Sequence, residues 1–358
     1  MKLDFCEVFD DYTSRCRKIP KEEYLSNGKY IVIDQGKNSI AGYTNVDDGL
    51  FEDVPAIVFG DHTRIIKYVD EPFFLGADGV KLLKSKIKDA NYKYLYYALR
   101  NARIPDTGYN RHFKWLKEIS LEYKDAESQK NIVKILDTVT NIIELCKAEL
   151  SELDNLIKAR FVEMFGDIKA NPYGFEKMAL KDTCTVITGN TPSRSVPEYY
   201  GDSIEWIKTD NIVSGRLSPS QALEYLSDEG IKVGRTVEKG AILMACIAGS
   251  VESIGRVCVT DRKVAFNQQI NAIVPEDYDT LFLHTMLQLS KEYLVEEINM
   301  ALKGILSKSK LEGKEFIVPS IEQQEQFAPF VAQVNKSKVV SQHTTSNPYI
   351  QNLNFAVK

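Results

Sequence analysis

One long amphipathic segment, from about Asp125 to Gly166, constrains this 358-residue chain more than any other feature. Its apolar residues recur in alternating steps of four and three, which is typical of the contact positions of a coiled-coil helix. Asp125 is suited to cap the first turn, and Gly166 can end the helix in a left-handed conformation. At 1.5 Å per residue such a helix spans roughly 60 Å. The predicted seam consists of Ile132, Leu136, Val139, Ile143, Cys146, Leu150, Leu153 and Ile157.

The sequence on the two sides of this helix is duplicated. Each half contains three short β-branched or aromatic runs bounded by Gly, Asp and Pro, which is typical of strands separated by turns. A helical segment follows each set, from Tyr92 to Asn101 in the first half and from Thr280 to about Ile298 in the second. We therefore predict an α+β fold with two mixed α/β globules separated by long helices that form an antiparallel coiled coil. The predicted strands are residues 53–59, 65–69 and 72–75, and residues 238–244, 255–259 and 264–266.

A second long helix, the expected partner of the first, begins near Ile321 at the corresponding point of the second copy. Its first seam positions are apolar, but the next two are Lys338 and Ser341, which are polar. We therefore predict a helix from Ile321 to about Val340 and then a loose or differently folded tail. The apolar seam positions of this helix are Phe327, Val331 and Val334. The predicted domains are residues 1–124 (first globule), 125–167 (long helix), 168–320 (second globule) and 321–358 (shortened second helix and irregular tail).

Composition excludes several classes of protein. A hydrophobic content of 44% and a charged content of 27% are those of a soluble globular protein. No apolar run is long enough to span a membrane, and the first residues lack the core of a signal peptide. The six cysteines form no CxxC pair, so we expect reduced thiols in a cytoplasmic protein. Because the net charge is −5, any contact with DNA requires local basic patches or another subunit.

The second globule carries the most distinctive polar segments, a loop at residues 188–194 and a cluster at residues 267–271. Asn and Gln amides can form paired hydrogen bonds with adenine, and Arg can do so with guanine. Arg194 and Lys208 could neutralise phosphates, which orients a protein on DNA without reading its sequence. In the alternative interpretation, the loop is simply a turn and Asn267 satisfies buried backbone groups.

The first globule lacks a comparable loop, so its candidates are different. Residues 34–39 (Asp-Gln-Gly-Lys-Asn-Ser) occupy a comparable early position, and Arg111 and Lys114 form a basic patch with Trp115. This patch could face phosphate or solvent, and both alternatives remain open. The tyrosines of Tyr92–Tyr97 could stack on bases, but on a short amphipathic helix we interpret them as packing against a sheet.

Several segments together resemble the DNA-specificity subunit of type I restriction–modification systems. They are TGNTPS (188–193), GDSIEWI (201–207), FNQQIN (266–271), EQQ (322–324) and FVEMFGD (161–167), and the resemblance extends from about residue 20 to residue 340. It implies two target-recognition domains that each read half of a split sequence in double-stranded DNA. It also implies two antiparallel helices that set the distance between the half-sites and dock two methyltransferase subunits. A separate motor-nuclease subunit would cut unmodified DNA.

The same resemblance implies that this chain binds no cofactor, with S-adenosylmethionine, ATP and Mg expected on partner subunits. The segment Asn171–Gly174 is similar to the NPPY motif of amino-methyltransferases, but it lacks the second proline and we interpret it as a linker turn. No glycine-rich phosphate loop is present. We therefore expect a non-catalytic recognition subunit, with a coiled-coil scaffold lacking DNA specificity as the alternative. The candidates for DNA contact are Gln35, Lys37, Asn38, Arg64, Arg111, Lys114, Thr191, Ser193, Arg194, Lys208, Asn211, Asn267, Gln268 and Gln269.

Overall fold

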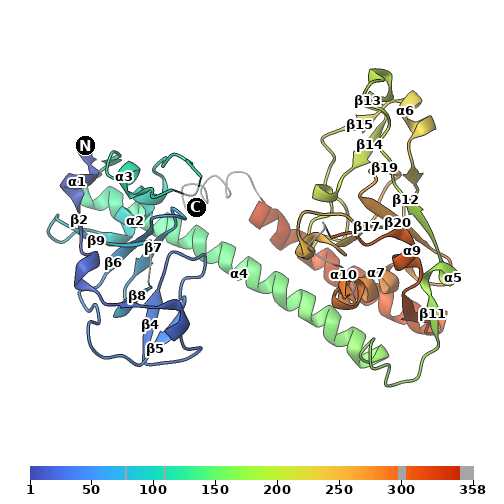
Figure 1. Cartoon of the computed structure of the whole chain (residues 1–358), viewed down its shortest axis with the longest axis horizontal. Helices are drawn as coiled ribbons and strands as arrows, with labels where there is room; N and C mark the ends of the chain where they lie inside the picture. The colour runs from blue at the N-terminus through green and yellow to red at the C-terminus, as the bar shows by residue number, and fades with distance from the viewer. Residues whose placement is uncertain (77–78, 109, 297–303, 347–358) are drawn as a thin grey trace. The chain divides into compact units, whose positions relative to one another are not determined.

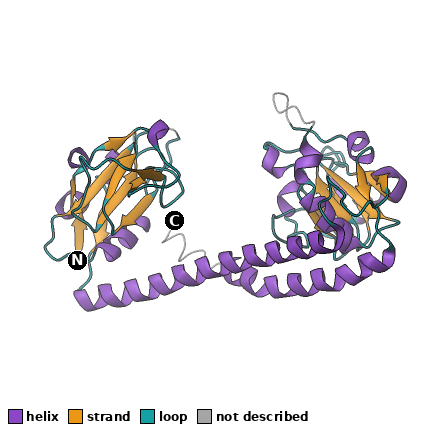
Figure 2. Ribbon diagram, turned by 90° about the horizontal axis from the view of Figure 1, so that it is seen from below, coloured by secondary structure: helices purple, strands orange, loops and turns teal. Residues whose placement is uncertain are grey.

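The computed structural model describes residues 1–76, 79–108, 110–296 and 304–346. The chain divides into two compact units inside the long helix α4 (Ala126–Phe165), with the division between Leu145 and Cys146 (Figure 1). Each unit contains strands flanked by helices (Figure 2). Among the described residues, no helix has the length and apolar character needed to cross a membrane.

The first unit is built on two four-stranded sheets. In one sheet the order is β2–β9–β6–β7 and all neighbours are antiparallel. In the other the order is β3–β8–β4–β5, and β8 runs parallel to both β3 and β4. The strands are β1 (Lys2–Asp4), β2 (Phe9–Asp11), β3 (Lys18–Ile19), β4 (Tyr30–Ile33), β5 (Gly42–Thr44), β6 (Ala56–Gly60), β7 (Ile66–Val69), β8 (Phe73–Gly76), β9 (Val80–Ser85) and β10 (Ser120–Glu122). The helices are α1 (Phe5–Val8), α2 (Tyr92–Arg100) and α3 (Phe113–Leu116).

The second unit repeats this plan with longer connections. Its sheets have the orders β12–β20–β17–β18 and β13–β15–β14–β19–β16. The strands are β11 (Lys177–Ala179), β12 (Cys184–Thr188), β13 (Tyr200–Gly201), β14 (Ile204–Ile207), β15 (Tyr225–Leu226), β16 (Thr236–Val237), β17 (Ile242–Ala245), β18 (Val257–Val259), β19 (Val264–Phe266), β20 (Ile270–Pro275) and β21 (Glu315–Ile317). The helices are α5 (Leu180–Thr183), α6 (Asp228–Val233), α7 (Thr280–Leu289), α8 (Lys291–Val295), α9 (Lys308–Glu312) and α10 (Ile321–Ser346).

Strand topology confirms the duplication predicted from the sequence. The antiparallel order β2–β9–β6–β7 matches β12–β20–β17–β18, and the parallel pair β4–β8 matches β14–β19. The pair β1–β10 likewise matches β11–β21. One predicted correspondence is wrong. Residues 34–39 follow β4 and therefore match the segment after β14, whereas the loop at residues 188–194 follows β12. Its counterpart in the first unit is the segment after β2, which begins at Tyr12.

The long helix has the ends that its sequence predicts. The backbone N–H of Ser128 donates to Oδ1 of Asp125 at 2.9 Å, which caps the first turn. Gly166 follows the last turn with φ +76°, the left-handed conformation that ends a helix and that residues with a Cβ atom rarely adopt. Of the eight predicted seam residues, Ile143 and Ile157 are buried and the other six are half-buried.

The second long helix differs from its prediction. It extends to Ser346 rather than ending near Val340, and its polar seam residues are buried rather than lost to solvent. Lys338, only 3% exposed, pairs with the Asp154 carboxylate of α4, and Ser341 Oγ donates to Glu149 Oε2 at 2.6 Å. Because α4 supplies polar partners for Lys338 and Ser341, the contact between the two helices continues beyond the apolar residues of α10. The predicted tail from residue 347 lies outside the described residues.

Four aromatic rings join α4, α7 and α10 in the core of the second unit. Phe161 and Phe165 of α4 lie 5.5 and 4.8 Å from Phe282 of α7, and both lie 5.6 Å from Phe327 of α10 between ring centroids. These rings are fully buried. As residue numbers fall along α4 from Phe161 to Asp154, their partners rise along α10 from Phe327 to Lys338. The two helices are therefore antiparallel, as predicted.

The predicted helix from Thr280 to about Ile298 is interrupted. Ser290, with φ −89° and ψ 13°, separates α7 from α8, and the new direction buries Leu294 in the same core as Phe282. The predicted end near Ile298 lies outside the described residues.

All six cysteines are free. Burial raises the pKa of the Cys246 and Cys258 thiols to about 12. These thiols are therefore protonated and unreactive near neutral pH.

Candidate nucleic-acid interface

The two polar segments predicted from the second half of the sequence meet in the structure. The backbone N–H of Asn190 donates to the carbonyl of Phe266 at 3.2 Å, and Thr191 Oγ1 donates to Oε1 of Gln268. A Cβ added to Gly189 would lie 2.2 Å from the carbonyl oxygen of Asn267, so only glycine allows this approach. The loop at residues 188–194 and the turn at 266–269 therefore form one surface.

Two candidate amides of the second unit are used within the fold. Asn267 is 5% exposed, and its Oδ1 accepts from the backbone N–H of Gln269 at 3.1 Å. Asn211 accepts from the backbone N–H of Lys208 at 2.9 Å and donates to the carbonyl of Gln221 at 3.0 Å. The structural interpretation thus accounts for both side chains. The exposed members of the predicted set are Thr191, Ser193, Arg194 and Gln268, with Lys208 and Gln269 half-buried.

Arg194 and Lys208 belong to a cluster around an indole ring. The guanidinium carbon of Arg194 lies 4.2 Å from the ring centroid of Tyr200 and 5.2 Å from that of Trp206. Lys208 Nζ lies 5.0 Å from the Trp206 centroid. Both cations pair with the carboxylate of Glu224, one with each oxygen. The structure therefore brings together two cations that the sequence suggested separately.

The rings of this cluster are anchored to the backbone of the loop, and its carboxylate is charged. Trp206 Nε1 donates to the carbonyl of Asn190 at 3.3 Å, and Tyr200 Oη donates to the carbonyl of Pro192 at 2.6 Å. The hydrogen bond from Lys208 lowers the pKa of the Glu224 carboxyl, with a further contribution from Arg194, although partial burial opposes it. Glu224 is consequently ionised near neutral pH.

Sequence reasoning missed Glu224. It lies 30 positions from Arg194, and the contact arises because Trp206 in β14 donates its backbone N–H to the carbonyl of Glu224 just before β15. No motif surrounds Glu224 in the sequence. Only knowledge of the β14–β15 pairing would have placed it beside these cations.

In the first unit, the loop after β4 meets the β6–β7 turn. The backbone N–H of His62 donates to Gln35 Oε1 at 3.2 Å, and Thr63 Oγ1 donates to the Gln35 carbonyl at 2.7 Å. The buried Lys67 donates to the carbonyl of Asn38 at 2.6 Å and lies 3.7 Å from the carboxylate of Asp34. These contacts hold a loop on which Lys37 and Asn38 are exposed.

The other first-unit candidates lie next to the same turn. Arg64 adopts φ 60° within it, and its Nη2 pairs with Asp106 at 2.6 Å. The carbonyl of Asp61 accepts from the backbone N–H of His112 at 2.8 Å, which ties down the segment carrying Arg111. Lys114, also exposed, lies 4.7 Å from the ring centroid of Trp115. The candidates Gln35, Lys37, Asn38, Arg64, Arg111 and Lys114 thus lie on segments held by one turn.

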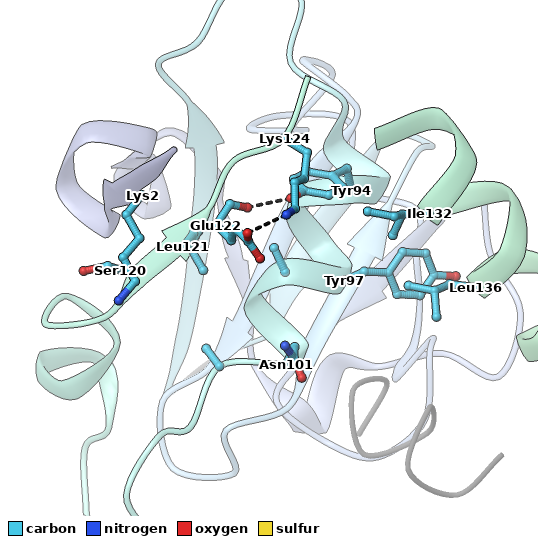
Figure 3. Close-up of a pocket in the computed structure, with 12 residues that line it drawn as sticks. Lys2, Tyr94, Tyr97, Asn101, Ser120, Leu121, Glu122, Lys124, Ile132 and Leu136 are labelled. Atoms are coloured by element: carbon cyan, nitrogen blue, oxygen red, sulfur yellow. Dashed lines mark hydrogen bonds and ion pairs between the residues drawn. The ribbon is translucent and has the colours of Figure 1, made fainter. Parts of the chain in front are cut away.

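The tyrosines of α2 pack inside the first unit, as we interpreted them. Tyr94 Oη donates to the carbonyl of Glu122 at 2.6 Å, and Tyr97 Oη donates to Asp137 at 2.7 Å. Figure 3 shows both rings between β10 and the start of α4, beside a cavity of about 450 Å³ that Ile132 and Leu136 also line. Burial and the Asp137 hydrogen bond raise the pKa of the Tyr97 hydroxyl. Neither ring is presented for stacking on a base.

Comparison with known proteins identifies the family. The family described as "Type I restriction modification DNA specificity domain" matches residues 3–155 and again residues 172–347. The chain belongs to this family. The two matches of the type I DNA specificity family follow the two copies found in the sequence, and the resemblance drawn from the sequence motifs is confirmed.

Several relatives of this specificity-family chain have been described. It is 32% identical over 147 residues to the type I restriction enzyme HindI specificity subunit of Haemophilus influenzae. It is 27% identical over 168 residues to the MjaIX specificity subunit of Methanocaldococcus jannaschii. These alignments cover 39% and 45% of this chain, and 31% and 38% of the relatives. The chain therefore matches about a third of the length of these curated relatives.

A solved structure extends the similarity over the whole fold. The type I restriction–modification S subunit from M. genitalium superposes with a TM-score of 0.65 at 14% identity, covering 100% of this chain and 95% of that one. The α+β architecture with two globules and long helices is thus that of a known S-subunit fold.

The segment Asn171–Gly174 forms a turn in this specificity-family chain. Asn171 adopts φ 45°, its Oδ1 accepts from the backbone N–H of Phe175 at 3.0 Å, and its Nδ2 donates to the carbonyl of Phe175 at 2.8 Å. The Asn171 amide is therefore engaged by the chain's own backbone. Within the described ranges, no group of three His, Cys, Asp or Glu side chains is placed to hold a metal ion.

Proposed function

We propose that this chain is the DNA-specificity subunit of a type I restriction–modification complex. Each unit reads one half of a bipartite site in double-stranded DNA, and the chain itself performs no chemistry. The observation that carries this proposal is a repeated strand topology with unlike loops, within a family defined by DNA specificity. Two equivalent scaffolds with different loops suit the reading of two different half-sites. A scaffold without DNA specificity would have no use for that difference.

The second unit reads its half-site with the surface formed by residues 188–194 and 266–269. The exposed amide of Gln268 can form paired hydrogen bonds with adenine in the major groove. Thr191, whose hydroxyl donates to Gln268, and Ser193 are further exposed polar side chains of the loop. Arg194 and Lys208 hold the phosphate backbone, which fixes the register of the unit without specifying bases.

The first unit reads the other half-site with the segments around the β6–β7 turn. Gln35 and Asn38 supply amides, while Lys37, Arg64 and Lys114 supply positive charge for phosphates. Because these side chains differ from those of the second unit, the two half-sites differ in sequence.

The chemistry belongs to partner subunits. Two methyltransferase subunits dock on α4 and α10 and methylate adenine after flipping it from the duplex. A motor-nuclease subunit completes the restriction enzyme. S-adenosylmethionine, ATP and Mg are bound by those partners. Docking is supported by exposed apolar residues of α4, among them Ile135, Ile142 and Leu145, because apolar side chains that recur along one helix can form an interaction face.

Methylation mapping tests this function. Genomic DNA is sequenced from cells that express the chain with its methyltransferase, and from control cells that express the methyltransferase alone. We expect new adenine methylation at one split motif with two unlike halves. A continuous motif would contradict the two-unit assignment. No new methylation, where a related specificity subunit works in the same cells, would favour the scaffold.

A further inference from the structure

Glu224 neutralises both cations that the second unit offers to DNA. Its Oε2 accepts from Arg194 and its Oε1 accepts from Lys208, so each oxygen of the carboxylate is paired with one cation. All three side chains remain partly exposed, with 34% of Glu224, 55% of Arg194 and 35% of Lys208 accessible to solvent. The ion pairs therefore lie at the surface, where DNA can compete for them.

A second carboxylate of the same sheet provides a contrast. Glu205 is only 12% exposed, and it accepts from the backbone N–H of Ala222 at 2.8 Å as well as from Arg262. Its charge is thus fixed by the fold. In the described part of the chain, the Glu224 carboxylate contacts only the two cations. It can therefore leave them without breaking a backbone contact.

The two cations have aromatic contacts that do not depend on the carboxylate. Arg194 lies against the rings of Tyr200 and Trp206, and Lys208 lies against the ring of Trp206. A cation over an aromatic face is attracted by the ring quadrupole. Without Glu224, two positive charges would lie over one buried indole, and this arrangement attracts an anion.

We propose that Glu224 is an internal counterion that DNA phosphates must displace, and that it limits the sequence-independent affinity of the second unit. This inference rests on the proposed function, because it assigns Arg194 and Lys208 to the phosphate backbone. The cost of displacing Glu224 is the same for target and non-target DNA, so it lowers both affinities by the same factor. Non-target DNA offers phosphates but no matched base contacts, so its complexes, already the weaker ones, are the first to become too weak to persist.

Reading of a base by Glu224 is the competing explanation. A carboxylate can accept from the amino group of cytosine. Each Glu224 oxygen is already paired with a cation, so a cytosine amino group would have to share or displace these ion pairs, which favours the counterion role. The two explanations predict opposite effects of removing the charge.

The test replaces Glu224→Gln in the full chain assembled with its methyltransferase. Binding of a fluorescein-labelled duplex is measured by anisotropy between about 50 and 200 mM salt, once with the mapped motif and once with a scrambled sequence. We expect about 3- to 10-fold tighter binding of both duplexes at low salt, because exposed ion pairs of this kind are weak and DNA no longer has to break them. We also expect a steeper salt dependence.

Glu238→Gln is the matched control. It removes the same charge from the same unit, but Glu238 pairs with Lys263 at 2.6 Å rather than with a predicted DNA contact. The control should leave binding unchanged. Equal gains in both variants, or unchanged binding of Glu224→Gln, would refute the counterion role. Weaker binding of the duplex with the mapped motif alone would show instead that Glu224 reads a base. If the unaltered complex binds neither duplex at any salt concentration, the proposed function itself fails.

Discussion

Two neighbouring amides in the second unit have different environments and should respond differently to substitution. Gln268 is exposed beside Thr191, whereas Asn267 is buried and holds the backbone of Gln269. Gln268→Ala should relax discrimination at one position of one half-site, by about 1–3 kcal/mol, in methylation mapping. Asn267→Ala should instead lower the free energy of unfolding by about 1–3 kcal/mol in urea denaturation, because it leaves the partly buried N–H of Gln269 without its acceptor. Relaxation of both half-sites by Gln268→Ala would contradict the assignment of one unit to one half.

The buried His284 should make the second unit sensitive to acid. Burial lowers the pKa of His284 to about 4, with a contribution from the positive charge of Lys338, whereas the unfolded chain titrates near 6.5. Between these values the unfolded state binds the extra proton, so stability is complete above about pH 6.5 and falls as the pH decreases toward 4. The loss should reach about 3 kcal/mol at the lower end.

His284→Gln removes this titration and serves as the comparison. Unfolding is followed at several pH values through Trp206 fluorescence in a Trp115→Phe background. As the pH decreases from 6.5 toward 4, the unaltered chain should lose more unfolding free energy than the variant does. Parallel pH profiles would show that His284 does not titrate in this way.

At the residue scale, the sequence showed which polar segments to examine but not the environment of each side chain. The polar composition of residues 188–194 and 266–271 was visible, and these segments do meet. Asn267 and Gln268 could not be told apart, because the burial of Asn267 depends on its close approach to Gly189. Glu224 could not be found at all, because only strand pairing brings it to Arg194.

At the scale of the elements, the seam between α4 and α10 holds an ion pair whose two members differ in their exposure to solvent. Lys338 is almost completely buried, but Asp154 is 44% exposed. Asp154→Ala should therefore lower the free energy of unfolding by about 1–3 kcal/mol, less than for a fully buried pair, because Lys338 loses its counter-charge.

Lys338→Met should be neutral or stabilising, because methionine fills a similar volume without desolvating a charge. Urea denaturation of the two variants checks both; unchanged stability of Asp154→Ala would show that the pair contributes nothing.

The ends of α4 were predictable and the end of α10 was not. Asp125 and Gly166 act locally, so their sequence positions define the first helix. A lysine at a seam position predicts the loss of a coiled coil unless its partner is known. That partner, Asp154, lies 184 positions away, and no local pattern links the two residues.

At the scale of the whole molecule, the duplication was predictable because both copies keep their order of strands. Each copy begins with a strand that pairs with a strand near its end, as β1 does with β10 and β11 with β21. Loop correspondence was harder, because loops change length while strands do not. Residues 34–39 were matched to the wrong loop for this reason, and only the parallel pairs β4–β8 and β14–β19 reveal the equivalence.

Assembly with the methyltransferase should depend on a face of α4 whose apolar side chains are exposed in the described part of the structure. Leu145 is 60% exposed, and Ile142 and Ile135 lie near it at heptad-related positions. Leu145→Glu should leave the free energy of unfolding nearly unchanged, because the side chain is already in water. It should weaken methyltransferase binding at least tenfold, because docking would bury the new charge in an apolar interface.

Ser151→Glu is the matched control, since it adds the same charge to an exposed polar position of α4. Co-purification and analytical ultracentrifugation measure assembly of both variants. If both assemble normally, the methyltransferase does not use this face, and the half-buried Leu150 of the seam becomes the next residue to change. If both fail equally, the effect is one of charge on the helix rather than of an apolar contact. Loss in Leu145→Glu alone would place the partner on the face that Ile135, Ile142 and Leu145 share, and would explain why a helix of this length keeps apolar side chains in solvent.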